Sequence, residues 1–184
     1  MSSNKVWNKV PVPVRRFLIK AVLLFAVWQV VYLGFLQPKR IPDMQLTNIT
    51  CQATTYCLSW FYPDVDMLHV IDPRNDQLAI IHRHKKAIIG IGDPCNALEI
   101  FVLYWAFLLC FPGNVKRKWV FFAAGTAVIF VVNVWRCVAL AWLKMYHRSW
   151  VDISHHYIFT IIVYLIVFYM WVLFSKAEKG YAKK

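Results

Sequence analysis

The feature that most constrains this chain is a set of apolar stretches long enough to cross a lipid bilayer. A hydrocarbon core is about 30 Å thick and an α-helix rises about 1.5 Å per residue, so a span needs roughly 17–25 residues. Four stretches have this length, at residues 17–36, 95–111, 119–143 and 153–174. The sequence therefore predicts an all-α membrane protein, a four-transmembrane-helix bundle in which residues 1–184 form a single membrane domain.

Composition supports a membrane location. The chain is 60% hydrophobic and only 16% charged, whereas soluble domains are nearer half apolar and a quarter charged. Its formal net charge is +12, and in so apolar a chain this excess is typical of the cytoplasmic edges of spans. These values exclude a soluble enzyme, a disulfide mini-protein and a disordered chain, and we expect no nucleic-acid partner. A cleaved signal peptide is disfavoured because the first apolar run is too long and no cleavage site follows it.

Basic residues predict the orientation of the bundle. Lys and Arg precede the first stretch, separate the second from the third and follow the fourth. Short cytoplasmic flanks carry this excess, so we expect both termini in the cytoplasm and residues 37–94 outside, as an extracytoplasmic cap. Residues 67–71, 78–81 and 87–91 are typical of short strands, with a turn at 72–75, so the periplasmic cap is expected to contain a small sheet.

The cap also contains two cysteines and two basic clusters. Cys51 and Cys57 are a candidate disulfide in an oxidising periplasm. The clusters, at residues 39–40 and 82–86, are expected either to contact lipid headgroups or to be merely solvated. His82 and His84 are too few ligands for a metal site, so we expect no metal and no cofactor.

Few ionisable side chains lie within the predicted spans, and each is a candidate functional residue because a charge there is costly. The thiol of Cys95 begins the second stretch, and Arg136 lies roughly 10 Å below the outer end of the third. His155 and His156 begin the fourth. Three spans therefore bring a thiol, a guanidinium and an imidazole to one leaflet.

These residue types suit acyl transfer. A cysteine thiolate attacks a peptide carbonyl, and a histidine takes the thiol proton and returns one to the leaving amine. An arginine binds the oxyanion or a substrate carboxylate. The set predicts a cysteine transpeptidase or protease with Cys95 as nucleophile, Arg136 as stabiliser and His155 or His156 as acid–base group. In the alternative interpretation Cys95 is a packing residue, Arg136 pairs structurally with Glu99 and the histidines are interfacial.

Neighbouring side chains have supporting or structural roles. Asn133 lies three residues before Arg136 on the same helix face and is expected to hydrogen-bond whatever Arg136 binds. Glu99 lies one turn deeper than the thiol and is expected to be the ionic partner of Arg136. Cys110 and Cys137 are expected to be packing residues.

In this order the residues resemble the exosortase/archaeosortase family, most closely its short Bacteroidetes-type exosortases. The similarity covers about residues 93–171. It implies an integral-membrane cysteine transpeptidase that cleaves C-terminal sorting signals, made of a motif, a transmembrane helix and a basic tail. Such an enzyme acts at the outer, periplasmic face of the bacterial inner membrane and passes the acyl group to a lipid- or glycan-linked acceptor. The resemblance is carried by Cys95-Asn96 opening a span (GDPCNALEIF), Phe111-Pro112-Gly113, Asn133 and Arg136 (NVWR), and His155 before an aromatic-rich span.

The resemblance assigns roles to single positions. The family's cysteine corresponds to Cys95 and its arginine to Arg136. Its histidine corresponds to His155, because the family has an aromatic residue a few positions later and Phe159 fits, with His156 as the alternative. Ala97 departs from the pattern, since many members have glycine there.

Two functions of other classes stay open. A periplasmic thiol oxidoreductase would use Cys51 and Cys57. A non-catalytic membrane assembly or export subunit would retain Arg136 only as a buried structural charge. A metalloprotease is disfavoured because the chain has no HExxH motif.

Overall fold

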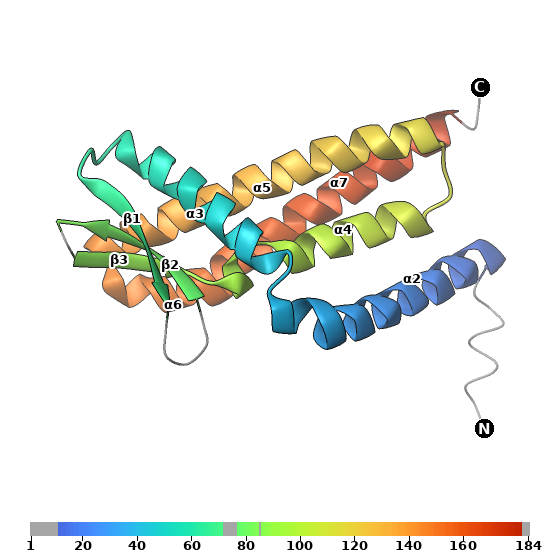
Figure 1. Cartoon of the computed structure of the whole chain (residues 1–184). Helices are drawn as coiled ribbons and strands as arrows, with labels where there is room; N and C mark the ends of the chain where they lie inside the picture. Colours follow the sequence, from blue (N-terminus) through green and yellow to red (C-terminus); the bar gives the residue numbers. More distant parts are fainter. Residues whose placement is uncertain (1–10, 72–76, 85, 182–184) are drawn as a thin grey trace.

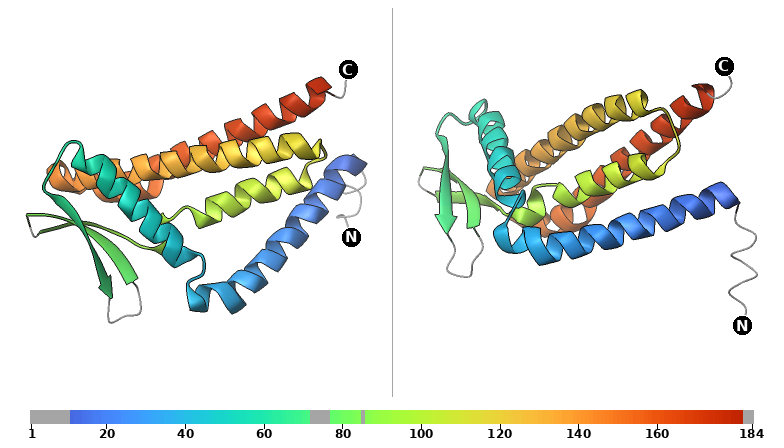
Figure 2. Two further views of the ribbon diagram at one scale, coloured as in Figure 1. Left: turned by 45° about the horizontal axis from the view of Figure 1, so that its top comes forward. Right: turned by 45° about the vertical axis from the view of Figure 1, so that its right-hand side comes forward.

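The computed structural model describes residues 11–71, 77–84 and 86–181, and most of these are helical (Figure 1). Helices α4, α5 and α7 pack against one another, and α2 packs mainly on α4. Helix α3 and a small sheet lie together at one end, opposite the start of α2 and the end of α7 (Figures 1 and 2). The helices are α2 (Val12–Val31), α3 (Asp43–Ser59), α4 (Leu98–Cys110), α5 (Val115–Tyr146), the short α6 (Val151–Ile153) and α7 (Phe159–Tyr181).

Within the residues that the structure describes, three helical segments are long and apolar enough to cross a membrane. They cover the first, third and fourth predicted stretches and extend beyond each of them, as Val12–Lys39, Val115–Tyr146 and Arg148–Glu178. The chain is therefore compatible with a membrane protein, as its composition indicated.

The second predicted span is shorter than expected. Helix α4 has 13 residues, about 20 Å, against a hydrocarbon core of about 30 Å. It begins late because Asp93–Cys95 form a separate 3₁₀ turn and Ala97 has a left-handed backbone, with φ of 65°. It ends at Cys110 because Phe111 is extended ahead of Pro112.

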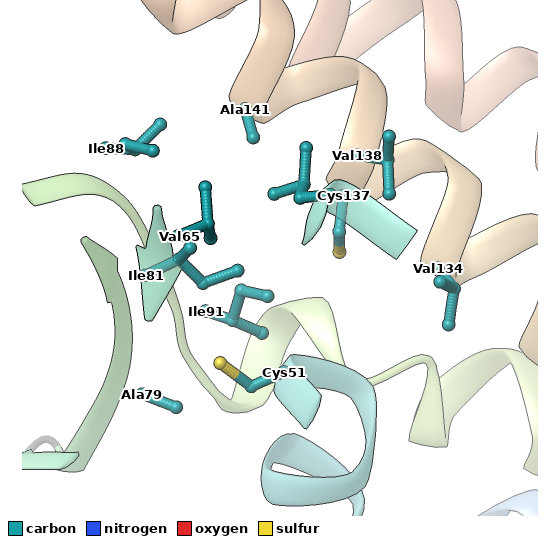
Figure 3. Close-up of a cluster of buried hydrophobic side chains, with 11 residues drawn as sticks. Cys51, Val65, Ala79, Ile81, Ile88, Ile91, Val134, Cys137, Val138 and Ala141 are labelled. Carbon is teal, nitrogen blue, oxygen red and sulfur yellow. The ribbon is translucent and has the colours of Figure 1, made fainter. Parts of the chain in front are cut away.

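The predicted sheet of the cap is confirmed. It has three antiparallel strands in the order β1-β2-β3, with bounds Val65–Ile71, Gln77–Arg83 and Lys86–Ile91. The turn expected at residues 72–75 lies outside the described residues. Side chains from all three strands pack with α3 and with the last third of α5 into one hydrophobic cluster (Figure 3), which joins the cap to the helices. Its members include Cys51, Val65, Ala79, Ile81, Ile88, Ile91, Val134, Cys137, Val138 and Ala141.

Helix α3 was not predicted, and it overturns the disulfide expectation. Cys51 is buried, Cys57 is partly buried, and both are free thiols. Six residues apart on a helix, two side chains point in directions about 120° apart and their backbones lie about 9 Å apart along the axis. A disulfide needs Cα atoms within about 7 Å, so the helix prevents this pairing.

A second hydrophobic cluster holds α4 against α5 and α7. Tyr104 is fully buried there, and its hydroxyl donates to the carbonyl of Phe121 at 2.8 Å. Gly125 of α5 lies directly against the Tyr104 ring, where even a Cβ atom would overlap it. This close approach fixes the position of α4 and therefore of the loop that precedes it.

Candidate functional site

Cys95 lies at the end of the 3₁₀ turn between β3 and α4, and its backbone is held on two sides. Its N–H donates to the carbonyl of Gly92 at 2.9 Å. Its carbonyl accepts from the side-chain amide of Asn133 on α5 at 2.8 Å. The thiol is therefore carried by a short loop tied to a neighbouring helix.

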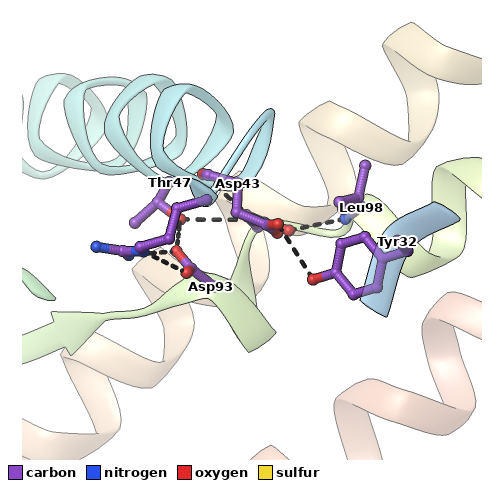
Figure 4. Close-up of polar contacts among 7 residues, drawn as sticks. Tyr32, Asp43, Thr47, Asp93 and Leu98 are labelled. Atoms are coloured by element: carbon purple, nitrogen blue, oxygen red, sulfur yellow. Dashed lines mark hydrogen bonds and ion pairs between the residues drawn. The ribbon is translucent and has the colours of Figure 1, made fainter. Parts of the chain in front are cut away.

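Asp93 anchors the same turn to the segment before α3. Its carboxylate accepts from Arg40 Nε at 2.8 Å and from Arg40 Nη2 at 2.6 Å, a bidentate pair. The hydroxyl of Thr47 on α3 donates to it at 2.9 Å (Figure 4). Two residues from Cys95, the loop is thus held by a charge-assisted contact between segments far apart in sequence.

Asn96 makes the matching contact on the other side of Cys95. It is 1% exposed, and its side-chain oxygen accepts from the N–H of Leu98, the first residue of α4, at 2.9 Å. Its amide nitrogen donates to the carboxylate of Asp43 on α3 at 2.8 Å. Asp43 also accepts from the hydroxyl of Tyr32 at 3.1 Å (Figure 4). We call these seven residues the anchor network: Tyr32, Arg40, Asp43, Thr47, Asp93, Asn96 and Leu98.

The structure brings Cys95, Arg136 and His155 together. Nε2 of His155 lies 3.6 Å from the Cys95 sulfur and 3.2 Å from Nη2 of Arg136. His155 lies in a π-helical turn, Ser154–Ile158, which precedes α7. Such wide turns occur frequently at functional sites. His156 is exposed and its Nδ1 lies 3.0 Å from the carbonyl of Asp152; its ring packs edge-on against that of His155, with centroids 4.9 Å apart, so it contacts the group only through His155.

The contacts of His155 define its hydrogen-bonding state. A guanidinium only donates, so the contact with Arg136 makes Nε2 of His155 the acceptor and places the ring proton on Nδ1. The lone pair of Nε2 is also the group that would accept the proton of the Cys95 thiol. The sulfur lies close enough to Nε2 for a hydrogen bond. Nε2 of His155 is thus within hydrogen-bond range of the guanidinium and of the thiol at the same time.

Two buried polar atoms beside this group have no hydrogen-bond partner among the described residues. They are Nε of Arg136, a donor, and Oδ1 of Asn133, an acceptor, and they lie three residues apart on α5. Leaving such atoms unsatisfied costs about 1–3 kcal/mol each. A peptide group offers one acceptor and one donor, so a peptide substrate beside α5 could satisfy both.

Glu99 does not have its expected role. It is exposed in the first turn of α4, and within the described part of the chain no ion pair joins it to Arg136. The expectation assumed that Cys95 and Glu99 share one helix face, but α4 starts only at Leu98. Arg136 instead contacts the imidazole of His155.

Several residues of the anchor network were missed as site residues. Arg40 was assigned to a headgroup-binding cluster, but it pairs with Asp93. Asp43 and Thr47 lie in a segment with no predicted structure. Asp93 had a usable signal, since a carboxylate two residues before a candidate nucleophile needs a partner when it is partly buried.

The second basic cluster is partly neutralised. Asp64 pairs with Arg83 at 3.1 Å and with His84 at 2.6 Å. Arg83 also lies over the ring of Tyr62, 4.3 Å from its centroid. No group of three or more His, Cys, Asp or Glu side chains placed to hold a metal ion is found in the described ranges.

Comparisons with models of protein families, with curated proteins and with solved structures find no match to this chain.

Proposed function

We propose that this chain is an exosortase-like membrane cysteine transpeptidase or protease. The observation that carries the proposal is the meeting of Cys95, His155 and Arg136, which come from three separate elements. A guanidinium, an imidazole and a thiol within hydrogen-bond range are the groups that nucleophilic acyl transfer needs. The residue pattern that resembles the exosortase/archaeosortase family, which includes these three residues, also supports the proposal.

In the proposed mechanism the thiol proton of Cys95 passes to Nε2 of His155, and the sulfur attacks the scissile carbonyl carbon. Arg136 stabilises the oxyanion that forms on the carbonyl oxygen. When the C–N bond breaks, His155 returns its proton to the leaving amine and a thioester remains on Cys95. A hydroxyl or amine of the acceptor then attacks the thioester, its proton goes to His155, and the thiol is regenerated. Water in place of the acceptor gives hydrolysis.

The proposed substrate is a secreted protein whose C-terminal sorting signal combines a short motif, a transmembrane helix and a basic tail, and the acceptor is lipid- or glycan-linked. The proposed location is the bacterial inner membrane, with α2, α4, α5 and α7 as a four-helix bundle and both termini in the cytoplasm. The basic residues Lys116, Arg117 and Lys118 support this orientation, because they begin α5 at the end remote from Cys95. The site then faces the periplasm.

The test is the capture and processing of a tagged sorting-signal protein by the full chain in membranes. Wild-type protein is expected to form a hydroxylamine-sensitive thioester at Cys95 and to shorten the substrate. Cys95→Ser is expected to do neither, and Arg136→Lys, which keeps the charge but removes Nε, is expected to be strongly impaired. Cys57→Ser is the matched control, because it removes a partly exposed thiol outside the site.

Other outcomes would point to other functions. Full processing by Cys95→Ser would remove the nucleophile from the proposal. Loss of function in Cys57→Ser but not in Cys95→Ser would favour a thiol oxidoreductase. Unchanged function in Cys95→Ser with poor accumulation of Arg136→Ala would favour an assembly subunit.

A further inference from the structure

The polarity of α3 is inverted relative to a helix that lies on a water-exposed surface. Its buried face is mostly polar, since Asp43, Thr47, Thr50 and Thr54 are at most 2% exposed. A helix facing water has the opposite arrangement, with its apolar stripe turned inward. The exposed face of α3 and its C-terminal end consists of uncharged side chains, many of them large and apolar: Met44, Gln45, Ile49, Gln52, Tyr56 and Trp60.

Most of the buried polar side chains of α3 have partners, whereas Oγ1 of Thr50 has none among the described residues. Asp43 and Thr47 belong to the anchor network, and the hydroxyl of Thr54 donates to the carbonyl of Thr50 within the helix at 2.7 Å. Three of the four buried polar side chains are therefore satisfied by the protein, and the apolar outward face is the side that needs an environment other than water.

Helix α5 provides a scale for the depth of α3. Its basic start is followed by the exposed Trp119, a residue type that favours the membrane interface. A hydrocarbon core that begins there, about 30 Å thick, ends near Val138. Cys51 of α3 packs in the cluster that contains Val134, Cys137, Val138 and Ala141 of α5 (Figure 3), and Leu58 belongs to the same cluster. The inner side of α3 thus contacts α5 where the hydrocarbon gives way to headgroups.

The exposed side chains of α3 change along this depth. Near its start the apolar ones are aliphatic, with Met44 and Ile49 44% and 50% exposed, beside the uncharged Gln45. At its end they are aromatic, with Tyr56 and Trp60 at 64% and 65%. The hydrogen bond between the hydroxyls of Tyr62 and Tyr146, 3.0 Å long, places this end beside the last residue of α5, about 40 Å along the helix from Trp119. Aliphatic side chains at depth and aromatic ones at the headgroups are the pattern of a lipid-facing surface.

We propose that α3 is embedded in the leaflet, with the face that holds Met44, Ile49, Tyr56 and Trp60 against lipid. Its partner is the bilayer that the long helices cross. The lipid-facing surface of α3 continues that of the segment Val12–Lys39, whose most apolar stretch has no residue buried inside the protein. Helix α3 contains no Lys, Arg or Glu, and its one Asp faces inward, so nothing charged opposes the contact. The proposal is independent of the enzymatic function proposed above.

The experiment is site-specific photo-crosslinking of the full chain in vesicles of phosphatidylethanolamine and phosphatidylglycerol. Benzoylphenylalanine replaces Ile49 or Tyr56, and the intact mass is measured after illumination. Leu165, exposed on the span α7, is the lipid-facing control, and Lys86, exposed on β3, is the control outside the lipid. Phospholipid adducts at Ile49 and Tyr56 are expected at yields comparable with Leu165 and several-fold above Lys86. Yields no higher than at Lys86, or adducts with a second protein, would overturn the proposal.

A second measurement covers the case in which a labelled variant fails to fold. Ile49→Asp places a charge on the proposed lipid face, and Ala87→Asp places the same charge on the exposed surface of β3. The amount of monodisperse protein extracted from membranes is expected to fall several-fold for Ile49→Asp alone. Equal amounts for the two variants would show that the face of α3 lies in water.

Discussion

Replacement of Asp93 by Asn tests whether the anchor network holds the loop that carries Cys95. The two side chains are close in shape, so packing is kept. The amide retains one acceptor oxygen but directs an NH₂ donor at the donors of Arg40, which occupy both carboxylate oxygens at 2.8 and 2.6 Å. The substitution therefore removes a charge-assisted hydrogen bond and the ion pair together.

The magnitude follows from the burial of the pair. A hydrogen bond to a charged group contributes about 1.5–3 kcal/mol, and breaking a fully buried ion pair costs about 3–5 kcal/mol. The side chains of Arg40 and Asp93 are 20% and 28% exposed, so water screens part of this interaction. We expect Asp93→Asn to lower the free energy of unfolding by about 2 kcal/mol, or the melting temperature by roughly 4–8 °C for a chain of this length.

The assay is thermal unfolding of the detergent-solubilised chain, together with the rate of Cys95 alkylation by a maleimide. Asp93→Asn is expected to melt earlier and to react faster, because the turn before α4 is loosened. Glu99→Gln is the matched carboxylate-to-amide control on the exposed first turn of α4, where only the helix dipole is affected, by about 0.3–1 kcal/mol. Arg40→Gln removes the other partner of the ion pair. If Asp93→Asn and Glu99→Gln melt alike, or if the losses in the free energy of unfolding of Asp93→Asn and Arg40→Gln simply add in the double variant, the anchoring role is refuted.

Three further predictions concern other parts of the chain. His155→Gln is expected to abolish substrate cleavage while His156→Gln retains it, as measured by substrate shortening; equal loss in both would contradict the site. Gly125→Ala is expected to cost about 1–3 kcal/mol, seen as a lower melting temperature, because its methyl group overlaps the ring of Tyr104. Alkylation of the unreduced, denatured chain is expected to add five labels by mass, since all five cysteines are free, whereas three labels would indicate a disulfide.

The long apolar helices and the strands could be predicted because their signals are local. A run of apolar residues in 119–143, or the β-branched strand at 87–91, contains its own evidence. That Cys95, Arg136 and His155 lie in one leaflet was predicted from depth, since each lies near the same end of its span, but depth does not show whether their side chains meet. Which histidine takes part was not decided by depth, because His155 and His156 are adjacent, and it depends on the π-helical turn that contains both.

Helix α3 and the anchor network could not be predicted, because their signals are not local. The buried face of α3 is polar, so the segment from Asp43 to Ser59 has no apolar periodicity to detect. Its partners are Asp93 and Asn96, about fifty residues away, and only the folded structure brings them together. The mistaken pairing of Glu99 with Arg136 has a related cause, since a left-handed residue at Ala97 separates Cys95 from α4 and breaks the assumed helical spacing.

The inverted polarity of α3 and the depth of the candidate site depend on each other. A loop carrying Asp93 and Asn96 beside the membrane is tolerable only if its polar groups are paired, and α3 provides partners in Asp43 and Thr47. Conversely, Asp43 can face inward only because Asn96 and Tyr32 bind it. Helix α3 is therefore part of what holds the site, and the helices without residues 37–94 would keep the contact of Asn133 with the carbonyl of Cys95 but lose the partners of Asp93 and Asn96.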